Sequence, residues 1–193
     1  MTMRENLKNK TIYVVLSDSG SIISKLLRLF TKAKYNHVSL SVREDLSEMY
    51  SFGRRWKYWP FYGGYVKETP YTGVFSVFPK AEIAVLPFAV TDSQYEKIKE
   101  YIEEMYAVRR YFTYSWKGIF WAAFHKKCKR KYYYFCSEFV QEILEKFQVV
   151  AQGELPEIAT PNDFFLQYEK TLSYVGLYRA YTVESAELEK NVS

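Results

Sequence analysis

The sequence predicts one α+β domain spanning residues 1–193, with a mostly antiparallel sheet. Three observations lead to this prediction. A chain of 193 residues is long enough to bury one core but short for two. Residues 36–42 and 48–53 have the pattern of a β-hairpin. Further strand-like and helix-like segments follow in an uneven order, which favours an α+β arrangement over a regularly alternating one.

The first predicted elements are a strand and a helix. Residues 11–17 form a β-branched apolar run, which predicts a strand. Asp18 or Ser19 would then cap a helix that reaches Phe30. The apolar residues of this segment recur at helical spacing, and they are Ile22, Ile23, Leu26, Leu27 and Phe30.

Residues 36–42 predict a strand with one polar face. Its apolar residues Val38, Leu40 and Val42 alternate with His37, Ser39 and Ser41. A turn at residues 43–45 leads into a returning arm at 48–53, so we expect His37 to lie on a paired and rigid strand. The small side chains of Ser39 and Ser41 would let a helix approach the His37 face closely.

An aromatic-rich stretch interrupts the regular patterns near residues 54–72. It combines Gly and Pro with many aromatic residues, and we expect a structured loop insertion with short strands there. Residues 81–87 then predict another strand. Asp92 would cap a helix whose apolar positions are Tyr95, Ile98, Ile102 and Met105.

The second half of the chain is predicted to be mainly helical. Residues 115–124 predict a short apolar helix, which is followed by a basic run at 126–131. Residues 137–147 predict a helix with Phe139, Val140, Ile143, Leu144 and Phe147 on one face, and Cys136 lies at its N-terminal end. Residues 160–163 predict a further helix start, and residues 172–183 a last strand before a polar C-terminal tail.

Composition argues against several classes of protein. Hydrophobic residues make up 48% of the chain and charged residues 25%, which is ordinary globular usage and argues against disorder or a membrane bundle. We find no apolar run long enough to span a bilayer and no signal peptide. Two cysteines, Cys128 and Cys136, cannot form a disulfide framework. These features together predict a cytoplasmic protein.

Cys136 is the candidate nucleophile. The thiolate is the reactive form of cysteine, and a helix N-terminus favours negative charge through its unpaired N–H groups and its dipole. The alternative interpretation is a small buried apolar residue at a helix start. Cys128 lies among lysines and arginines, but it is expected in an exposed loop without a partner.

His37 is the candidate general base, because the chain has only two histidines and the other, His125, lies in no comparable pattern. The alternative interpretation is a surface histidine on a hairpin. Both histidines and both cysteines together could nominally ligate zinc, but only His125 and Cys128 have the close spacing of paired ligands. We therefore predict no metal and no other cofactor.

Nucleic-acid binding is predicted to be weak and nonspecific. The basic run at 126–131 is followed by tyrosines, a combination that can contact phosphates and stack on bases. The net charge is nevertheless only +5, because 22 acidic residues balance most of the 27 basic ones. More often such a run is a solvated loop.

Two short motifs resemble those of a known family. Asn36-His-Val-Ser-Leu40 and Phe135-Cys-Ser-Glu-Phe-Val140 are similar to motifs of the circularly permuted papain-like hydrolases, which include the NlpC-type and YiiX-like cysteine hydrolases. That group carries a His-Val-Gly-like strand first and a Cys-Ser-Glu-Leu-Val-like helix start much later, the opposite order to papain. The resemblance implies a permuted papain-like fold in which the helix that carries the nucleophile packs against a mostly antiparallel sheet.

The resemblance also implies roles for three residues. Cys136 would be the nucleophile and His37 the general base, while a third polar residue on the strand after His37 would orient the imidazole. Aligning the hairpin puts Ser51 at the third position, where the family more often has His, Asn, Gln or Glu. Tyr50 and Glu48 are the alternatives at this position.

Two classes of function follow. The first is a thiol hydrolase, a cysteine peptidase or amidase acting on a peptide, a cell-wall fragment or another amide. Within the enzyme class, acyl transfer or hydrolysis on lipids is the alternative, so the expected partner is a small-molecule, peptide or lipid substrate. The second class is a noncatalytic binding module that keeps the fold. The substrate and the oligomeric state stay open at this point.

Overall fold

The fold is described from a computed structural model that covers residues 10–20, 33–55, 63–114 and 133–181. Several predicted features lie outside the described residues. They are most of the predicted helix after Asp18, the aromatic part of the 54–72 stretch, the predicted helix at 115–124, His125, Cys128, the basic run at 126–131 and the C-terminal tail.

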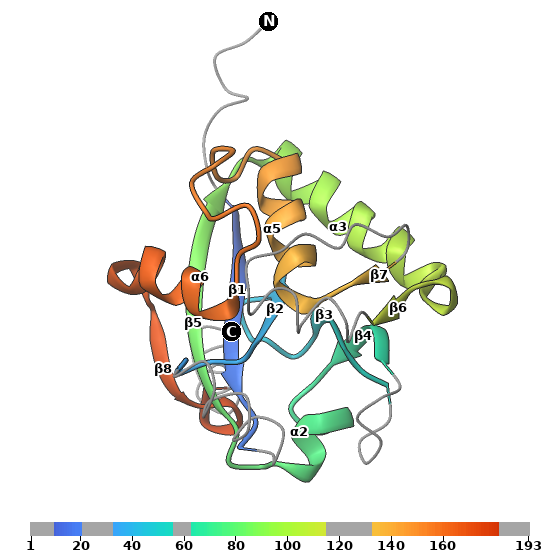
Figure 1. The fold of residues 1–193 in the computed structure, drawn as a ribbon, viewed down its shortest axis with the longest axis vertical. Coiled ribbons are helices and arrows are strands. Elements are labelled where there is room, and N and C mark those ends of the chain that lie inside the picture. The colour runs from blue at the N-terminus through green and yellow to red at the C-terminus, as the bar shows by residue number, and fades with distance from the viewer. Residues whose placement is uncertain (1–9, 21–32, 56–62, 115–132, 182–193) are drawn as a thin grey trace, which may run out of the picture.

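A six-stranded sheet forms the centre of the molecule, in the order β4-β3-β2-β1-β5-β8 (Figure 1). Every neighbouring pair in this sheet is antiparallel, as the sequence predicts. The strands are β1 (Lys10–Asp18), β2 (His37–Ser41), β3 (Met49–Arg54), β4 (Gly63–Glu68), β5 (Glu82–Val90) and β8 (Tyr174–Leu177). The short strands β6 (Thr113–Tyr114) and β7 (Tyr133–Tyr134) pair separately and in parallel.

The register of the sheet fixes the position of His37. β1 pairs with β2 so that Ser17 lies opposite His37 and Val14 lies opposite Leu40. On its other side β1 pairs with β5 along its whole length. His37 is therefore the first residue of a strand that is paired within the sheet, which confirms the predicted hairpin setting.

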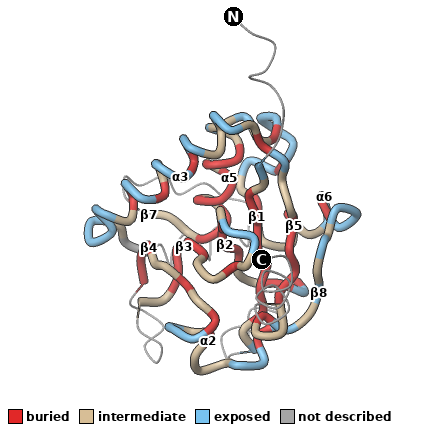
Figure 2. The backbone as a smooth tube through the Cα atoms, turned by 180° about the vertical axis from the view of Figure 1, so that it is seen from behind, coloured by how far each residue is buried: buried red, intermediate tan, exposed pale blue. Residues whose placement is uncertain are grey.

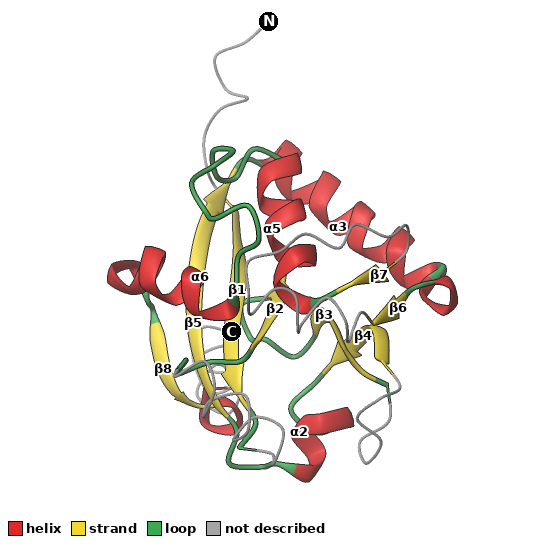
Figure 3. Ribbon diagram, in the orientation of Figure 1, coloured by secondary structure: helices red, strands yellow, loops and turns green. Residues whose placement is uncertain are grey.

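Helices α3 (Asp92–Ala107) and α5 (Cys136–Lys146) lie side by side over one face of the sheet (Figures 1 and 3). Their buried residues, among them Ile98, Ile102, Phe139 and Val140, share one core with Val38 and Leu40 of β2. Figure 2 shows the buried positions following the central strands and the inner side of α5. The apolar residues recur at helical spacing, so each helix buries one face in this core. Such burial stabilises an amphipathic helix more than its intrinsic helix propensity does.

The opposite face of the sheet carries a second apolar cluster. It contains Val15 and Val85 from the strands, Phe75 from the short helix α2 (Gly73–Val77), and Tyr178 from beyond β8. Helix α6 (Pro161–Tyr168) and the 3₁₀ turns η1 (Arg109–Tyr111) and η2 (Glu169–Thr171) complete the fold. None of the helices in the described part of the chain combines the length and the apolarity needed to cross a membrane.

The structure differs from the sequence predictions at several element ends. Thr91 caps α3, not Asp92, because its hydroxyl accepts the Gln94 N–H in a capping box. The last strand ends at Leu177, well short of the predicted residue 183. The 54–72 stretch does contain a short strand, as expected: it is β4, which lies at the edge of the main sheet.

Helix α5 also packs on a different face of β2 from the one expected. Successive side chains of a strand point to opposite faces, and α5 packs with Val38 and Leu40. Ser39 and Ser41 therefore point away from α5. Their expected role, which was to let a helix approach closely, is wrong.

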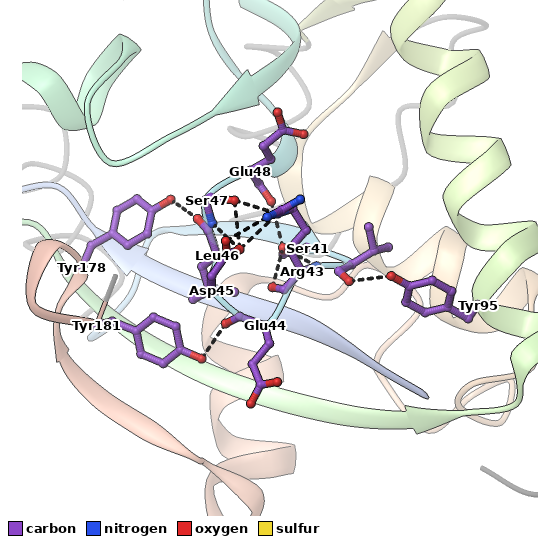
Figure 4. Close-up of polar contacts among 11 residues, drawn as sticks. Ser41, Arg43, Glu44, Asp45, Leu46, Ser47, Glu48, Tyr95, Tyr178 and Tyr181 are labelled. Carbon is purple, nitrogen blue, oxygen red and sulfur yellow. Dashed lines mark hydrogen bonds and ion pairs between the residues drawn. The ribbon is translucent and has the colours of Figure 1, made fainter. Parts of the chain in front are cut away.

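The turn between β2 and β3 is held by side chains from distant parts of the chain (Figure 4). The hydroxyls of three tyrosines donate to its backbone carbonyls: Tyr95 to Val42 at 2.9 Å, Tyr178 to Leu46 at 2.6 Å and Tyr181 to Glu44 at 2.8 Å. Leu46 has a φ of 51°, a conformation that L-residues rarely adopt. These bonds satisfy the turn carbonyls and fix the end of β2 opposite to His37.

Candidate active site

Cys136 begins helix α5, as the sequence predicts. The residue before it, Phe135, is the N-cap and has no side-chain oxygen to accept a hydrogen bond from the first turn. The N–H groups of that turn and the helix dipole thus favour negative charge at Cys136. The side chain is a free thiol and is nearly buried, with an exposed fraction of 5%.

His37 forms an ion pair with Glu68 of β4. The ring nitrogen Nε2 lies 3.0 Å from Oε1 and 3.3 Å from Oε2 of the carboxyl group. The exposed fractions of the two side chains are 20% and 10%, so the pair is largely shielded from water. Attraction between opposite charges is stronger in such a setting than at the surface.

Glu68 reaches His37 by crossing a strand. β3 lies between β4 and β2 in the sheet, and at the crossing it carries the small residues Ser51 and Gly53. A Cβ atom at Gly53 would lie 3.3 Å from Glu68 Oε1 and 3.4 Å from Ser51 Oγ. Gly53 thus leaves the room that the carboxyl group occupies.

Ser39 and Ser51 flank the Glu68 carboxyl group. The Ser39 hydroxyl donates to Oε2 at 2.6 Å in a buried position. The Ser51 hydroxyl makes no hydrogen bond of normal length within the described residues, although it lies close enough to help lower the pKa of Glu68. Ser39 is therefore the firmer of the two contacts.

The contact between His37 and Glu68 raises the pKa of His37 and lowers that of Glu68. Burial alone would lower the pKa of His37, but the Glu68 charge, with further contributions from hydrogen bonding to Cys136 and Glu68, raises it to about 10. Burial alone would raise the pKa of Glu68, but the charge and hydrogen bond of His37, together with the serines, lower it. The stable state near neutral pH is thus an imidazolium beside a carboxylate.

The His37 ring also interacts with the side chain of Cys136, which is among the causes that raise the pKa of His37. Because Nε2 faces Glu68, Nδ1 is the nitrogen that remains for the thiol. Strand β2, helix α5 and strand β4 therefore each bring one reactive side chain to the same point. The predicted pair, Cys136 and His37, is brought together.

The residue that contacts the His37 imidazole is not the one that the alignment of the hairpin suggested. Ser51, which the family resemblance placed there, lies beside Glu68, and it is Glu68 that contacts the imidazole. The alternatives Tyr50 and Glu48 are engaged with each other and with Lys67: Tyr50 donates to Glu48 at 3.3 Å, and Lys67 Nζ donates to Glu48 at 3.0 Å. These three groups are thus held together away from the ring.

Sequence reasoning missed Glu68 because it fell in the predicted loop insertion. A signal was present in the small residues of the neighbouring arm, Ser51 and Gly53, which leave a path across β3. These small residues alone do not show which carboxylate reaches across β3. That information requires the strand order, which places β4 next to β3.

The described residues contain no group of three or more His, Cys, Asp and Glu side chains arranged to hold a metal ion. The groups that the described site offers are a thiol, an imidazole and a carboxylate. A scan against known protein families, a search of curated proteins and a search of solved structures each found no match. The case for a function consequently depends on the motifs and on the geometry of this site.

Proposed function

We propose that this protein is a thiol hydrolase, a cysteine peptidase or amidase, with Cys136 as nucleophile, His37 as general base and Glu68 as the residue that orients His37. One observation carries the proposal: His37 Nε2 lies 3.0 Å from a buried carboxylate while the same ring interacts with a thiol at a helix start. Nucleophile, base and orienting group in contact are the arrangement that thiol catalysis needs. The permuted papain-like family resemblance supports the roles of Cys136 and His37.

The reaction follows from these roles. It starts from a thiolate beside an imidazolium, in which the Cys136 proton has passed to His37 Nδ1, and the thiolate attacks the carbonyl carbon of the amide. The negative charge that develops on the carbonyl oxygen is stabilised by N–H groups at the start of α5. The C–N bond then breaks as His37 returns the proton to the leaving amine, which leaves a thioester on Cys136.

Glu68 acts on the imidazole throughout this cycle. It accepts a hydrogen bond from Nε2–H, so Nδ1 is the nitrogen that exchanges its proton with the thiol and the leaving amine. Its charge also stabilises the imidazolium that forms when the thiol gives up its proton. A carboxylate that is buried and fixed performs both tasks better than one in water.

Water completes the reaction by hydrolysing the thioester to an acid and a free thiol. An amine or alcohol acceptor in place of water would give acyl transfer, which is the alternative chemistry of the same site. The two outcomes separate experimentally, because hydrolysis gives a free acid whether or not an acceptor is added. Product analysis with and without an added amine or alcohol therefore distinguishes them.

The test is the reactivity of Cys136 toward alkylation. We expect iodoacetamide at pH 6 to label Cys136 faster than Cys128, because an unperturbed thiol, with a pKa of about 8.5, is almost fully protonated there. His37→Ala should slow the labelling of Cys136 about tenfold or more, since it removes the positive charge beside the thiol, and a nearby opposite charge shifts a pKa by about 1–3 units, each a factor of ten. Timed mass spectrometry of the two cysteine peptides measures the rates.

The matched controls are His125→Ala, which should leave the labelling rate unchanged, and Cys128, which serves as an internal reference. Cys136 is nearly buried, so a smaller neutral reagent, methyl methanethiosulfonate, is used in parallel. A Cys136 that is inert to both reagents, or that labels equally fast without His37, would contradict the proposed catalytic unit.

A further inference from the structure

Ser39 makes a buried contact with Glu68 that the proposed catalytic roles do not use. It lies on β2, two residues after His37, and its side chain is fully buried. Its hydroxyl donates to Glu68 Oε2 at 2.6 Å. A separation this short is typical of a hydroxyl bound to a charged carboxylate.

The two oxygens of Glu68 differ in their nearest partner, although both lie within 3.3 Å of His37 Nε2. Oε1 is the nearer to His37 Nε2, at 3.0 Å, whereas Oε2 is held by Ser39. The last torsion of a glutamate side chain is broad, so one contact alone leaves the carboxyl group free to rotate. The second contact removes that freedom and keeps Oε1 directed at the imidazole.

The Ser39 bond also offsets part of the cost of burying the carboxylate. A buried charge is tolerated only where hydrogen bonds replace its water. The titratable groups that interact with Glu68 are His37 on β2 and Tyr178 beyond β8, and Cys136 on α5 reaches it through the His37 ring. β3 contributes only Ser51 and Gly53 next to the carboxyl group, and Ser39 is thus its one firm neutral donor among the described residues.

We propose that Ser39 is a positioning residue that fixes the Glu68 carboxylate on His37 and so sets the basicity of the imidazole. The proposal rests on the proposed function only in its consequence for catalysis. The contacts from Ser39 to Glu68 and from Glu68 to His37 can be tested without a substrate, because the ionisation of His37 is measurable directly. A residue that acted only in folding would leave the ionisation of His37 unchanged.

The test is an NMR titration of the imidazole signals in the unmodified protein, Ser39→Ala, Glu68→Gln and Ser41→Ala, with His125→Ala used to assign the two histidines. We expect Glu68→Gln to lower the pKa of His37 by about 1–3 units, the effect of removing an opposite charge at this distance. Ser39→Ala should lower it by about one unit, because the carboxylate is then less firmly held and less readily charged.

Ser41→Ala is the matched control. Ser41 is a fully buried serine on the same face of the same strand, but its hydroxyl donates to the backbone carbonyls of Arg43 and Glu48. It should therefore leave the pKa of His37 unchanged. An unchanged pKa of His37 in folded Ser39→Ala, or equal shifts in both serine variants, would overturn the proposal.

A measurement on the unmodified protein covers the case in which Ser39→Ala does not fold. A buried hydroxyl bonded at this distance should give a Ser39 hydroxyl proton signal that exchanges slowly with water, and a rapidly exchanging one would overturn the proposal. If Cys136 in the unmodified protein proves unreactive, the hydrolase function fails, whereas the titration of His37 still decides the role of Ser39.

Discussion

The Glu68 side chain shows how much one residue of the site depends on its neighbours. It is a carboxylate with little contact with solvent, and its charge is maintained by His37 and by the hydroxyl of Ser39. At the crossing of β3 it passes Gly53, where a Cβ atom would lie 3.3 Å from Oε1. The absence of a side chain at Gly53 is thus part of the site geometry.

A prediction at this scale concerns Gly53→Ala. The added methyl group would lie 3.3 Å from Glu68 Oε1 and from Val66 Cγ2, closer than most Cβ atoms are found to other atoms. We expect the carboxyl group to move and the pKa of His37, measured by NMR titration, to fall, though less than in Glu68→Gln. The double variant Gly53→Ala Val66→Ala relieves the contact with Val66 alone, so a full return of the pKa of His37 in it would show that Glu68 was not displaced.

At the scale of elements, the turn between β2 and β3 determines how well β2 can hold His37. The turn contains an arginine and acidic residues at its tip, and Arg43 donates to Asp45 at 2.9 Å in an exposed ion pair of the kind that contributes little stability. The tyrosine hydroxyls contribute more, because Tyr178 satisfies a carbonyl that is buried (Figure 4). The turn is therefore part of the tertiary structure and not a free hairpin loop.

The prediction for this element compares two tyrosines. Tyr178→Phe leaves the buried Leu46 carbonyl without its donor at 2.6 Å, which should lower the free energy of unfolding by about 1–3 kcal/mol. Tyr181→Phe removes a bond of the same type to the Glu44 carbonyl, but in an exposed position where water replaces the donor, so its effect should be well below that. Urea denaturation of both variants measures the difference, and equal losses would contradict this account of the turn.

At the scale of the whole molecule, the ion pair between β2 and β4 links the stability of the sheet to pH. The pKa of His37 is raised from 6.5 to about 10, so its contribution is complete below pH 6.5 and is lost as the pH rises toward 10. The pKa of Glu68 is lowered from 4.5, so its contribution is present above pH 4.5 and is lost as the pH falls through the folded value. The pair therefore stabilises the fold most between about pH 4.5 and 6.5.

This window predicts the behaviour of His37→Gln. The difference in the free energy of unfolding between the unmodified protein and the variant should be largest near pH 6 and should shrink steadily up to pH 10. Tyrosine ionisation affects both proteins in the same way and cancels in the comparison. Urea denaturation at pH 6, 8 and 10 measures the difference, and a difference that does not change with pH would show that His37 is not charged by its partner.

Features that depend on local periodicity were predictable from the residues alone. Alternation in residues 36–42 identified β2 and placed His37 on it, and helical spacing after Cys136 identified α5 and the thiol at its start. Apolar runs likewise identified β1 and β5, because burial of one face leaves a regular trace along the chain. These are the parts of the candidate site that need no knowledge of distant pairing.

The residue that contacts His37 and the face of β2 that meets α5 both depend on tertiary contacts. Glu68 follows an aromatic-rich stretch with no clear period, and it becomes a neighbour of His37 only because β4 pairs with β3 at the edge of the sheet. Alternation says that Ser39 and Val38 point to opposite faces but not which face the helix covers. Strand order and layer packing depend on contacts between residues far apart in the chain, and local periodicity carries no record of them.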